Sequence, residues 1–278
     1  MGSFTFEEKE AMIPKTIHYC WFGRNPMPKL AKKCIKSWKK KCPDYRIIEW
    51  NEDNFDVSSC PLYVRQAFEA KKWAFVSDYA RLKIVYENGG IYLDTDVEAV
   101  KPFDPLLTNQ AFFGLEYGVY VATGLGFGAE KGAEILELLM EPFQDIPFIL
   151  PDGKLDTTPC PVRETEVFLR YGLKQDNSLQ TIMNCLILPA EYLCPYDGRK
   201  GILNDTDNTY SIHWYDGSWL SPQDNTKQRQ YIKDVKRQIL IDQFIHLPNR
   251  LMKHLIGEKA YQTLKHVLKR EVKNYLVK

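Results

Sequence analysis

The first part of the chain alternates between short apolar runs and a segment with helical spacing. Residues 15–22 (KTIHYCWF) and 45–50 (YRIIEW) are rich in β-branched and aromatic side chains, which favours strands. Between them, residues 30–40 place Ile35 and Trp38 on one side of a helix. Strands joined by a helix are typical of a parallel sheet with crossover helices, so we predict an α/β fold.

A longer helical pattern leads into a pair of carboxylates. Apolar residues recur at helical spacing over residues 61–87, and the tripeptide Asn-Gly-Gly at 88–90 is typical of a helix end. Residues 91–93 (IYL) predict a short buried strand, and Asp94 and Asp96 follow it directly. Ligands of open α/β sheets bind beyond the carboxyl ends of strands, so these carboxylates are the first candidates for a site.

The rest of the chain predicts shorter elements. The glycines within residues 111–128 indicate turns and a bulge rather than a phosphate-binding loop, because no helix follows in register. Other predicted elements are two short strands within 111–128, helices at 133–140 and 164–172, and strands at 181–188 and 210–214. Beyond Pro222 the pattern is helical. We therefore predict a main domain over residues 1–222 and a basic helical extension over 223–278.

Charge is distributed unevenly along the chain. Residues 1–225 hold 24 Lys and Arg against 32 Asp and Glu, a net of −8, whereas residues 226–278 hold 13 against 4, a net of +9. A basic segment favours an anionic surface, but a solvated helix face has the same composition, and both interpretations stay open. The seven cysteines form no CxxC pair, which fits reduced thiols. With no signal-peptide pattern and no apolar run of membrane-spanning length, we expect a cytoplasmic protein that is soluble or at most peripheral.

Asp94 and Asp96 have the chemistry of a cation site. Two carboxylates at a strand end provide the oxygen ligands that Mg²⁺ or Mn²⁺ prefers, and such a cation can neutralise a departing diphosphate. An acidic turn without a ligand is the alternative for an isolated D-x-D motif.

Two further groups of residues could complete this site. Asp78 and Arg81 lie three apart on the preceding helix, where they could hold a ribose and a diphosphate or form an ordinary helix ion pair. His213 follows a predicted strand and could ligate the cation, while Ser218 and Trp219 could donate hydrogen bonds to phosphate oxygens. A structural role for the histidine stays open.

Four blocks of sequence in this order resemble glycosyltransferase family 32. The central blocks, residues 73–81 (WAFVSDYAR) and 88–96 (NGGIYLDTD), resemble its D-X-D sugar-binding region, and residues 13–23 and 213–219 resemble its opening strand and closing H…SW element. That family includes yeast initiating α-1,6-mannosyltransferases and bacterial capsule and lipopolysaccharide enzymes, and it is similar to the glucosyltransferase domain of the large clostridial toxins. The resemblance covers about residues 13–220 and is thin between 110 and 205.

The resemblance implies a GT-A fold, with a Rossmann-like nucleotide-binding half, over residues 1–222. It implies a retaining enzyme that moves a hexose from a UDP- or GDP-linked donor to a glycan or lipid-linked oligosaccharide, with Mn²⁺ or Mg²⁺ as cofactor. For the nucleotide, the resemblance implies that Trp21 stacks on the base, that Asp78 holds the ribose or base, and that Tyr92 lines the pocket. For the sugar and diphosphate, it implies that Arg81 contacts the sugar or diphosphate, that Asp94 contacts ribose and sugar hydroxyls, and that Ser218 and Trp219 close over the diphosphate. Asp96 is expected to bind the metal with His213.

Two other functions remain open from the residues alone. The run 91–97 (IYLDTDV) also fits a haloacid-dehalogenase-type phosphatase, in which Asp94 would be the nucleophile and Asp96 the general acid. A nucleotide-sugar-binding module without turnover would keep the same carboxylates. The basic residues 250–278 further predict docking on an anionic inner membrane leaflet, whereas the acidic main domain argues against nucleic-acid binding.

Overall fold

The computed structural model describes residues 13–217 of the chain. Its centre is an eight-stranded sheet in the order β2-β1-β3-β7-β5-β9-β8, with β6 paired to β5. The strands are β1 (Thr16–Cys20), β2 (Arg46–Trp50), β3 (Gly90–Tyr92), β5 (Ala111–Glu116), β6 (Tyr120–Val121), β7 (Phe127–Ala129), β8 (Gln180–Ile182) and β9 (Cys185–Leu188).

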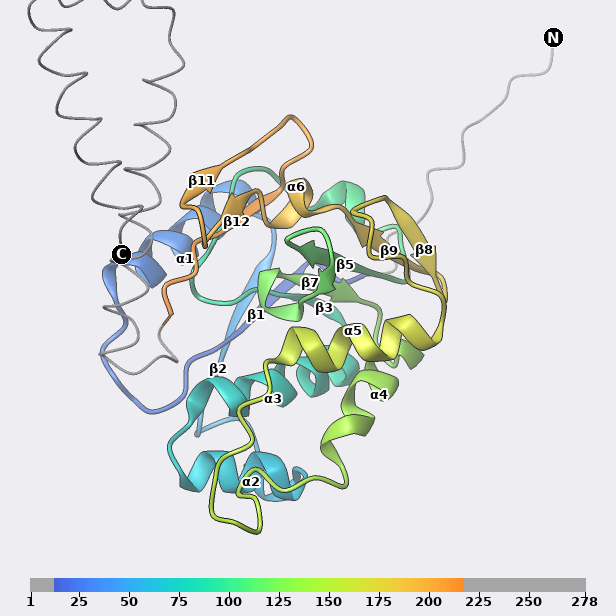
Figure 1. Cartoon of the computed structure of the whole chain (residues 1–278). Helices are drawn as coiled ribbons and strands as arrows, with labels where there is room; N and C mark the ends of the chain where they lie inside the picture. The colour runs from blue at the N-terminus through green and yellow to red at the C-terminus, as the bar shows by residue number, and fades with distance from the viewer. Residues whose placement is uncertain (1–12, 218–278) are drawn as a thin grey trace, which may run out of the picture. The chain divides into compact units, whose positions relative to one another are not determined.

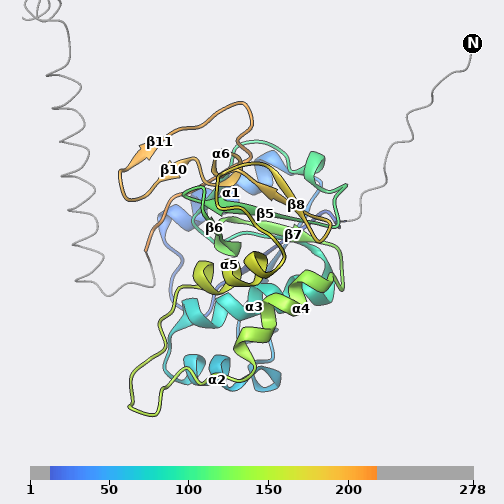
Figure 2. The same cartoon turned by 45° about the vertical axis from the view of Figure 1, so that its right-hand side comes forward.

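Helices lie on both faces of this sheet (Figures 1 and 2). One face carries α1 (Lys29–Lys41), and the other carries α3 (Trp73–Asn88), α4 (Glu134–Met140) and α5 (Cys160–Arg170), with α2 (Leu62–Glu69) packed on α3. Successive strand residues point to opposite faces, so the neighbours Phe112 and Phe113 of β5 enter different hydrophobic cores. The arrangement confirms the predicted α/β class and is the one expected of a GT-A fold.

Smaller elements complete the described part of the chain. A short helix, α6, spans Ala190–Leu193, and two-stranded sheets pair β12 with β4 and β10 with β11. These strands are β4 (Val97–Ala99), β10 (Tyr196–Asp197), β11 (Ile202–Leu203) and β12 (Ser211–His213). The short 3-10 helices are η1 (Val57–Ser59), η2 (Asp104–Leu106), η3 (Thr123–Leu125) and η4 (Glu141–Phe143).

Parallel pairing brings two strand ends to one edge of the sheet. β1 is parallel to both β2 and β3, and His18 is opposite Tyr92 in the register. The backbone N–H of Leu93 continues this ladder by donating to the His18 carbonyl at 3.0 Å. Trp21, which follows β1, and Asp94, which follows β3, therefore leave the sheet at the same edge.

Two predicted elements are each divided by residues in the left-handed backbone region. The helical pattern over 61–87 forms two helices, because Lys71 has φ +56° and the chain turns between α2 and α3. The pattern over 181–188 forms a hairpin, because Met183 and Asn184 have φ +50° and +61°. Such paired positive φ angles are those of a tight hairpin turn, which the apolar composition concealed.

The sheet is mixed rather than parallel, which corrects another expectation. β7 is antiparallel to both β3 and β5, while β5 and β9 are parallel. Residues 111–128 accordingly supply three strands or parts of strands where two were predicted. The predicted boundary at residue 222 and the extension over 223–278 lie outside the described residues. Among the helices of residues 13–217, none has the length and apolar character that crossing a membrane requires.

Candidate metal centre

The loop between β3 and β4 carries the two acidic residues. Gly89 and Gly90 end α3 with φ +68° and +109°, and a Cβ on Gly90 would lie only 2.7 Å from the Thr16 carbonyl. Glycine therefore allows β3 to begin immediately after the helix, close against β1. The loop then turns tightly, since the N–H of Val97 donates to the Asp94 carbonyl at 3.0 Å.

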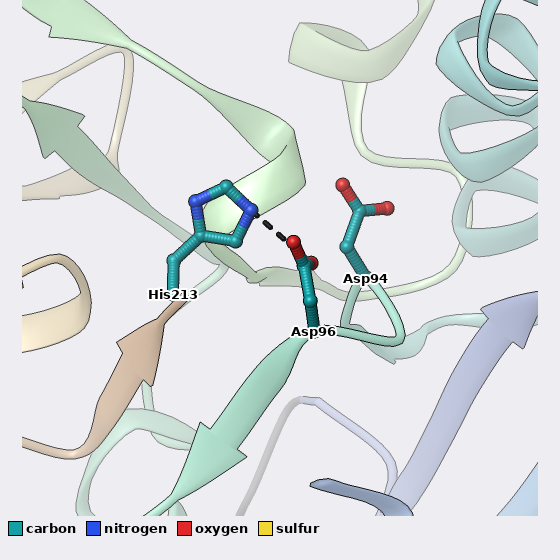
Figure 3. Close-up of side chains that lie close together, drawn as sticks. All are labelled: Asp94, Asp96 and His213. Atoms are coloured by element: carbon teal, nitrogen blue, oxygen red, sulfur yellow. Dashed lines mark ion pairs between the residues drawn. The ribbon is translucent and has the colours of Figure 1, made fainter. Parts of the chain in front are cut away.

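Asp94, Asp96 and His213 form a cluster beyond this strand end. One ligand atom from each of the three side chains lies within 4.8 Å of the others. Figure 3 shows both carboxylates on the same side of the loop, with the imidazole of His213 facing Asp96. Antiparallel pairing of β12 with β4, which sets His213 opposite Val97, brings the histidine to this position. The fold thus brings His213 beside a carboxylate pair that lies far from it in the sequence.

Asp96 is held from two directions. Its Oδ1 lies 3.2 Å from Nε2 of His213, and its Oδ2 accepts the backbone N–H of Asp216 at 2.9 Å. Its own carbonyl accepts the N–H of Trp214 at 3.0 Å. The segment following β12 therefore fixes both the backbone and the side chain of Asp96.

Asp94 is instead held by groups of α3 and β3. Nη2 of Arg81 lies 3.4 Å from Oδ1 of Asp94 and 2.9 Å from Oδ1 of Asp78. The hydroxyl of Tyr92 donates to Oδ1 of Asp94 at 2.9 Å, and the guanidinium lies over the Tyr92 ring at 5.2 Å from its centre. The predicted pair of Asp78 and Arg81 is therefore an ion pair, and it also reaches the acidic loop. Arg81 is only 4% exposed, so this charge acts where water screens it little.

The ionisation of the cluster follows from these contacts. Burial raises the pKa of Asp94 above its usual value, although Arg81 opposes the shift. Burial also acts on Asp96, but His213 and the backbone N–H of Asp216 together outweigh it and lower the pKa of Asp96. Burial disfavours the charged form of His213, yet the two carboxylates outweigh it and raise the pKa of His213. The two carboxylates thus favour a positive charge on the imidazole of His213.

The residues present fit a divalent cation. Carboxylate oxygens and an imidazole nitrogen are ligands that Mn²⁺ and similar ions accept, and the three ligand atoms are close enough to share one ion. Nδ1 of His213 is buried and has no hydrogen-bond partner among the described residues. Asp94, Asp96 and His213 would hold the ion.

The other residues predicted for the site do not belong to this three-residue cluster. Trp21 leaves the same sheet edge, and its indole N–H donates to the Asn25 carbonyl at 2.8 Å. Ser218 and Trp219 lie outside the described residues. His18 is a core residue, bonded through Nε2 to the Gly89 carbonyl and through Nδ1 to the Trp50 indole. Burial lowers the pKa of His18 to about 4, so its ring is neutral.

Further residues lie behind the acidic loop, and no predicted motif includes them. Thr123 and Gly124 of η3 lie against Arg81 and Asp94, and Glu164 of α5 lies behind Thr123. The signal available was the small-residue run at 122–128 (ATGLGFG), since glycine in a strand region often marks a close backbone approach. The prediction of turns and a bulge for those glycines does not include this contact.

The described chain thus combines a strand-end D-x-D with an added histidine on a mixed α/β sheet. Residues 28–113, which include both aspartates, match the family described as "Glycosyltransferase sugar-binding region containing DXD motif". This match confirms the predicted resemblance to a glycosyltransferase family for residues 28–113. The match favours a glycosyltransferase over the phosphatase alternative.

Individual proteins are also similar in sequence or structure to this chain. The chain is 24% identical over 274 residues to Subversion of eukaryotic traffic protein A of Legionella pneumophila, covering 82% of this chain and 40% of that protein. It is 32% identical over 110 residues to inositol phosphoceramide mannosyltransferase 3 of Schizosaccharomyces pombe, covering 38% and 31%. The chain thus spans 40% or less of these relatives' lengths. Among solved structures, the PaToxG glycosyltransferase has a TM-score of 0.44 at 19% identity, covering 57% and 69% of the two chains.

Proposed function

We propose that the protein transfers a hexose from a UDP- or GDP-linked donor and that it requires a divalent cation, Mn²⁺ or Mg²⁺. The observation that carries this proposal is the cluster of Asp94, Asp96 and His213 at the end of β3, inside and beside the matched sugar-binding region. A bound cation would neutralise the charge that develops on the diphosphate as the bond to the sugar breaks.

The residues around the cluster support specific roles in this reaction. Arg81 is a buried cation beside the acidic loop, so it can stabilise negative charge on the donor without a large cost of reorganisation. Asp78 and Asp94 are carboxylates that can accept hydrogen bonds from ribose or sugar hydroxyls. We assign Trp21 to base stacking, Tyr92 to the nucleotide pocket, and Ser218 and Trp219 to closure over the diphosphate.

We further propose that transfer retains the anomeric configuration. This rests on the resemblance to the retaining family, and it is checked by following the product anomer with NMR as it forms. A product of inverted configuration would contradict the proposal while leaving glycosyl transfer itself intact.

For the acceptor, we propose a glycan or lipid-linked oligosaccharide of the kind built in capsule or lipopolysaccharide synthesis. The similarity to an inositol phosphoceramide mannosyltransferase supports a lipid-linked acceptor. We also propose a cytoplasmic enzyme whose basic residues 250–278, which lie outside the described residues, dock on an anionic membrane surface. Unchanged binding to phosphatidylserine-containing liposomes after removal of these residues would contradict the membrane proposal.

Thermal-shift screening tests the central proposal directly. UDP, GDP and their hexose conjugates are screened with Mn²⁺, with Mg²⁺ and with EDTA. A ligand at 100 times its dissociation constant stabilises the folded state by about 2.7 kcal/mol, a measurable increase in Tm. We expect one nucleotide series to stabilise the protein only when a cation is present. No stabilisation by either series, together with no donor hydrolysis, would contradict the proposed function.

A further inference from the structure

Glu164 of α5 is a buried carboxylate outside both the matched region and the metal cluster. The residue is only 2% exposed, and no lysine or arginine forms an ion pair with it among residues 13–217. Burial raises the pKa of Glu164 to about 7, with Arg81 the main opposing influence. A buried carboxylate of this kind costs stability that an apolar side chain would not, so its presence calls for a specific role.

Both carboxylate oxygens of Glu164 accept hydrogen bonds from Thr123. Oε2 accepts the backbone N–H of Thr123 at 2.8 Å, and Oε1 accepts the Thr123 hydroxyl at 2.5 Å. The next residue, Thr165, accepts the backbone N–H of Val121 at 2.9 Å through its hydroxyl. Two consecutive side chains of α5 therefore fix the backbone at the start of η3.

The segment that Glu164 fixes forms a wall behind the acidic loop. A Cβ on Gly124 would lie 2.7 Å from Oδ2 of Asp94 and 3.0 Å from Nη1 of Arg81, so the backbone there is in close contact with both groups. Nη1 of Arg81 also lies 3.4 Å from the Thr123 hydroxyl. A small displacement of η3 would therefore move Asp94 and Arg81 directly.

We propose that Glu164 is a positioning residue of the donor site. By binding Thr123 through both carboxylate oxygens, it holds the 123–125 turn against Asp94 and Arg81. It thereby fixes the carboxylate that meets the cation and the guanidinium that meets the diphosphate. Glu164 itself contacts neither cation nor donor. The inference rests on the proposed function, because it concerns how that same site is aligned.

The test compares Glu164→Ala and Glu164→Gln with the control Glu166→Gln, which alters an exposed carboxylate of the same helix. Mn²⁺ binding is measured by isothermal titration calorimetry with UDP and with GDP, and kcat and KM are measured for hydrolysis of the matching donor. Supporting residues of this kind change metal affinity or activity by about 10- to 100-fold. We expect a loss in this range for Glu164→Ala, with KM raised more than kcat falls. We expect a smaller loss for Glu164→Gln, which keeps one acceptor for Thr123, and none for the control.

A second pair of variants covers the case in which Glu164→Ala does not fold. Thr123→Val removes the hydroxyl that contacts both Glu164 and Arg81, whereas Thr123→Ser keeps it. We expect Thr123→Val to weaken Mn²⁺–nucleotide binding and Thr123→Ser to bind like the unaltered protein. Folded Glu164→Ala and Thr123→Val proteins with unchanged affinity and KM would overturn the positioning role alone. If the unaltered protein binds no Mn²⁺–nucleotide complex, both the proposed function and this inference are overturned.

Discussion

Nε2 of His213 lies 3.2 Å from Oδ1 of Asp96, although the two residues are far apart in the sequence. Antiparallel pairing of β12 with β4 creates this contact, and the backbone N–H groups of Trp214 and Asp216 strengthen it by donating to Asp96. The metal cluster therefore depends on a strand pair that is separate from the central sheet. The following predictions concern this cluster and the residues behind it.

Asp96→Asn should remove a cation ligand while leaving the fold intact. Asn keeps the size of the side chain and a single oxygen, but it loses the negative charge. We expect Mn²⁺ affinity and donor hydrolysis to fall by about 100-fold or more. Calorimetry and a donor-hydrolysis assay measure these losses, with Asp152→Asn, an exposed carboxylate paired to Lys154, as the control. Undiminished turnover in a folded Asp96→Asn protein would remove the basis of the proposed function.

Substitutions of His213 separate ligation of the cation from support of Asp96. His213→Gln keeps a hydrogen-bond donor near Asp96 but lacks the imidazole, whereas His213→Ala lacks both. We expect Mn²⁺ affinity to fall by about 10- to 100-fold in both variants, because both lose the nitrogen ligand. If His213→Gln binds Mn²⁺ like the unaltered protein, the histidine only orients Asp96.

Arg81→Ala should lower the free energy of unfolding by more than the loss of an exposed ion pair does. The guanidinium contacts Asp78 and Asp94 in a buried setting, so its removal leaves two carboxylates without a counter-charge. Breaking a buried pair in this way costs about 3–5 kcal/mol. Urea unfolding measures the loss, with Lys83→Ala as the control on the same helix. That residue pairs with Glu87 near the surface and should cost less than about 1 kcal/mol. Equal losses in the two variants would show that the buried network adds no stability.

Gly124→Ala should reduce activity with a smaller effect on folding. The added methyl group would lie 2.7 Å from Oδ2 of Asp94, which is too close, so the Asp94 carboxylate would be displaced from its present position. We expect Mn²⁺ affinity and kcat/KM to fall by about 10-fold or more, as for other displaced site residues. Gly153→Ala serves as a control for backbone strain without a steric contact, because its φ is +80° while a Cβ there meets nothing within 4 Å. Unchanged kcat/KM in Gly124→Ala would mean that Asp94 tolerates displacement.

Glu164 should make stability fall as pH rises from about 4.5 to about 7. Its folded-state pKa is raised, so the folded protein keeps a proton that the unfolded chain releases in this range, and the slope of stability against pH is negative there. The raised pKa of Glu164 corresponds to a loss of about 3 kcal/mol in the free energy of unfolding, at about 1.36 kcal/mol per pH unit. The charged neighbours that face it are Arg81 and Asp78 of α3.

Glu164→Gln has no ionisable group at this position. Its stability relative to the unaltered protein should therefore increase by about 3 kcal/mol between about pH 4.5 and pH 7.5. Urea unfolding at both pH values, with Glu166→Gln alongside, measures the difference. A difference in stability that is the same at both pH values would show that Glu164 ionises normally.

The sequence by itself determined the elements and residues that depend on local pattern. The apolar run at 91–93 ended by Asp94 and Asp96, and the spacing of Asp78 and Arg81 on one helix, follow from strand and helix periodicity over a few residues. The split of residues 61–87 and the hairpin at 183–184 were hidden because their turns use Lys71, Met183 and Asn184 rather than glycine.

Only the tertiary structure decided which distant residues join this site. His213 reaches Asp96 through β12–β4 pairing, and Glu164 reaches Thr123 through the packing of α5 against η3. Neither contact leaves a periodic signal, since strand partners and helix docking are set by burial of the whole apolar surface rather than by neighbouring residues. The acidic pair is thus a local property of the chain, and its alignment is a property of the complete fold.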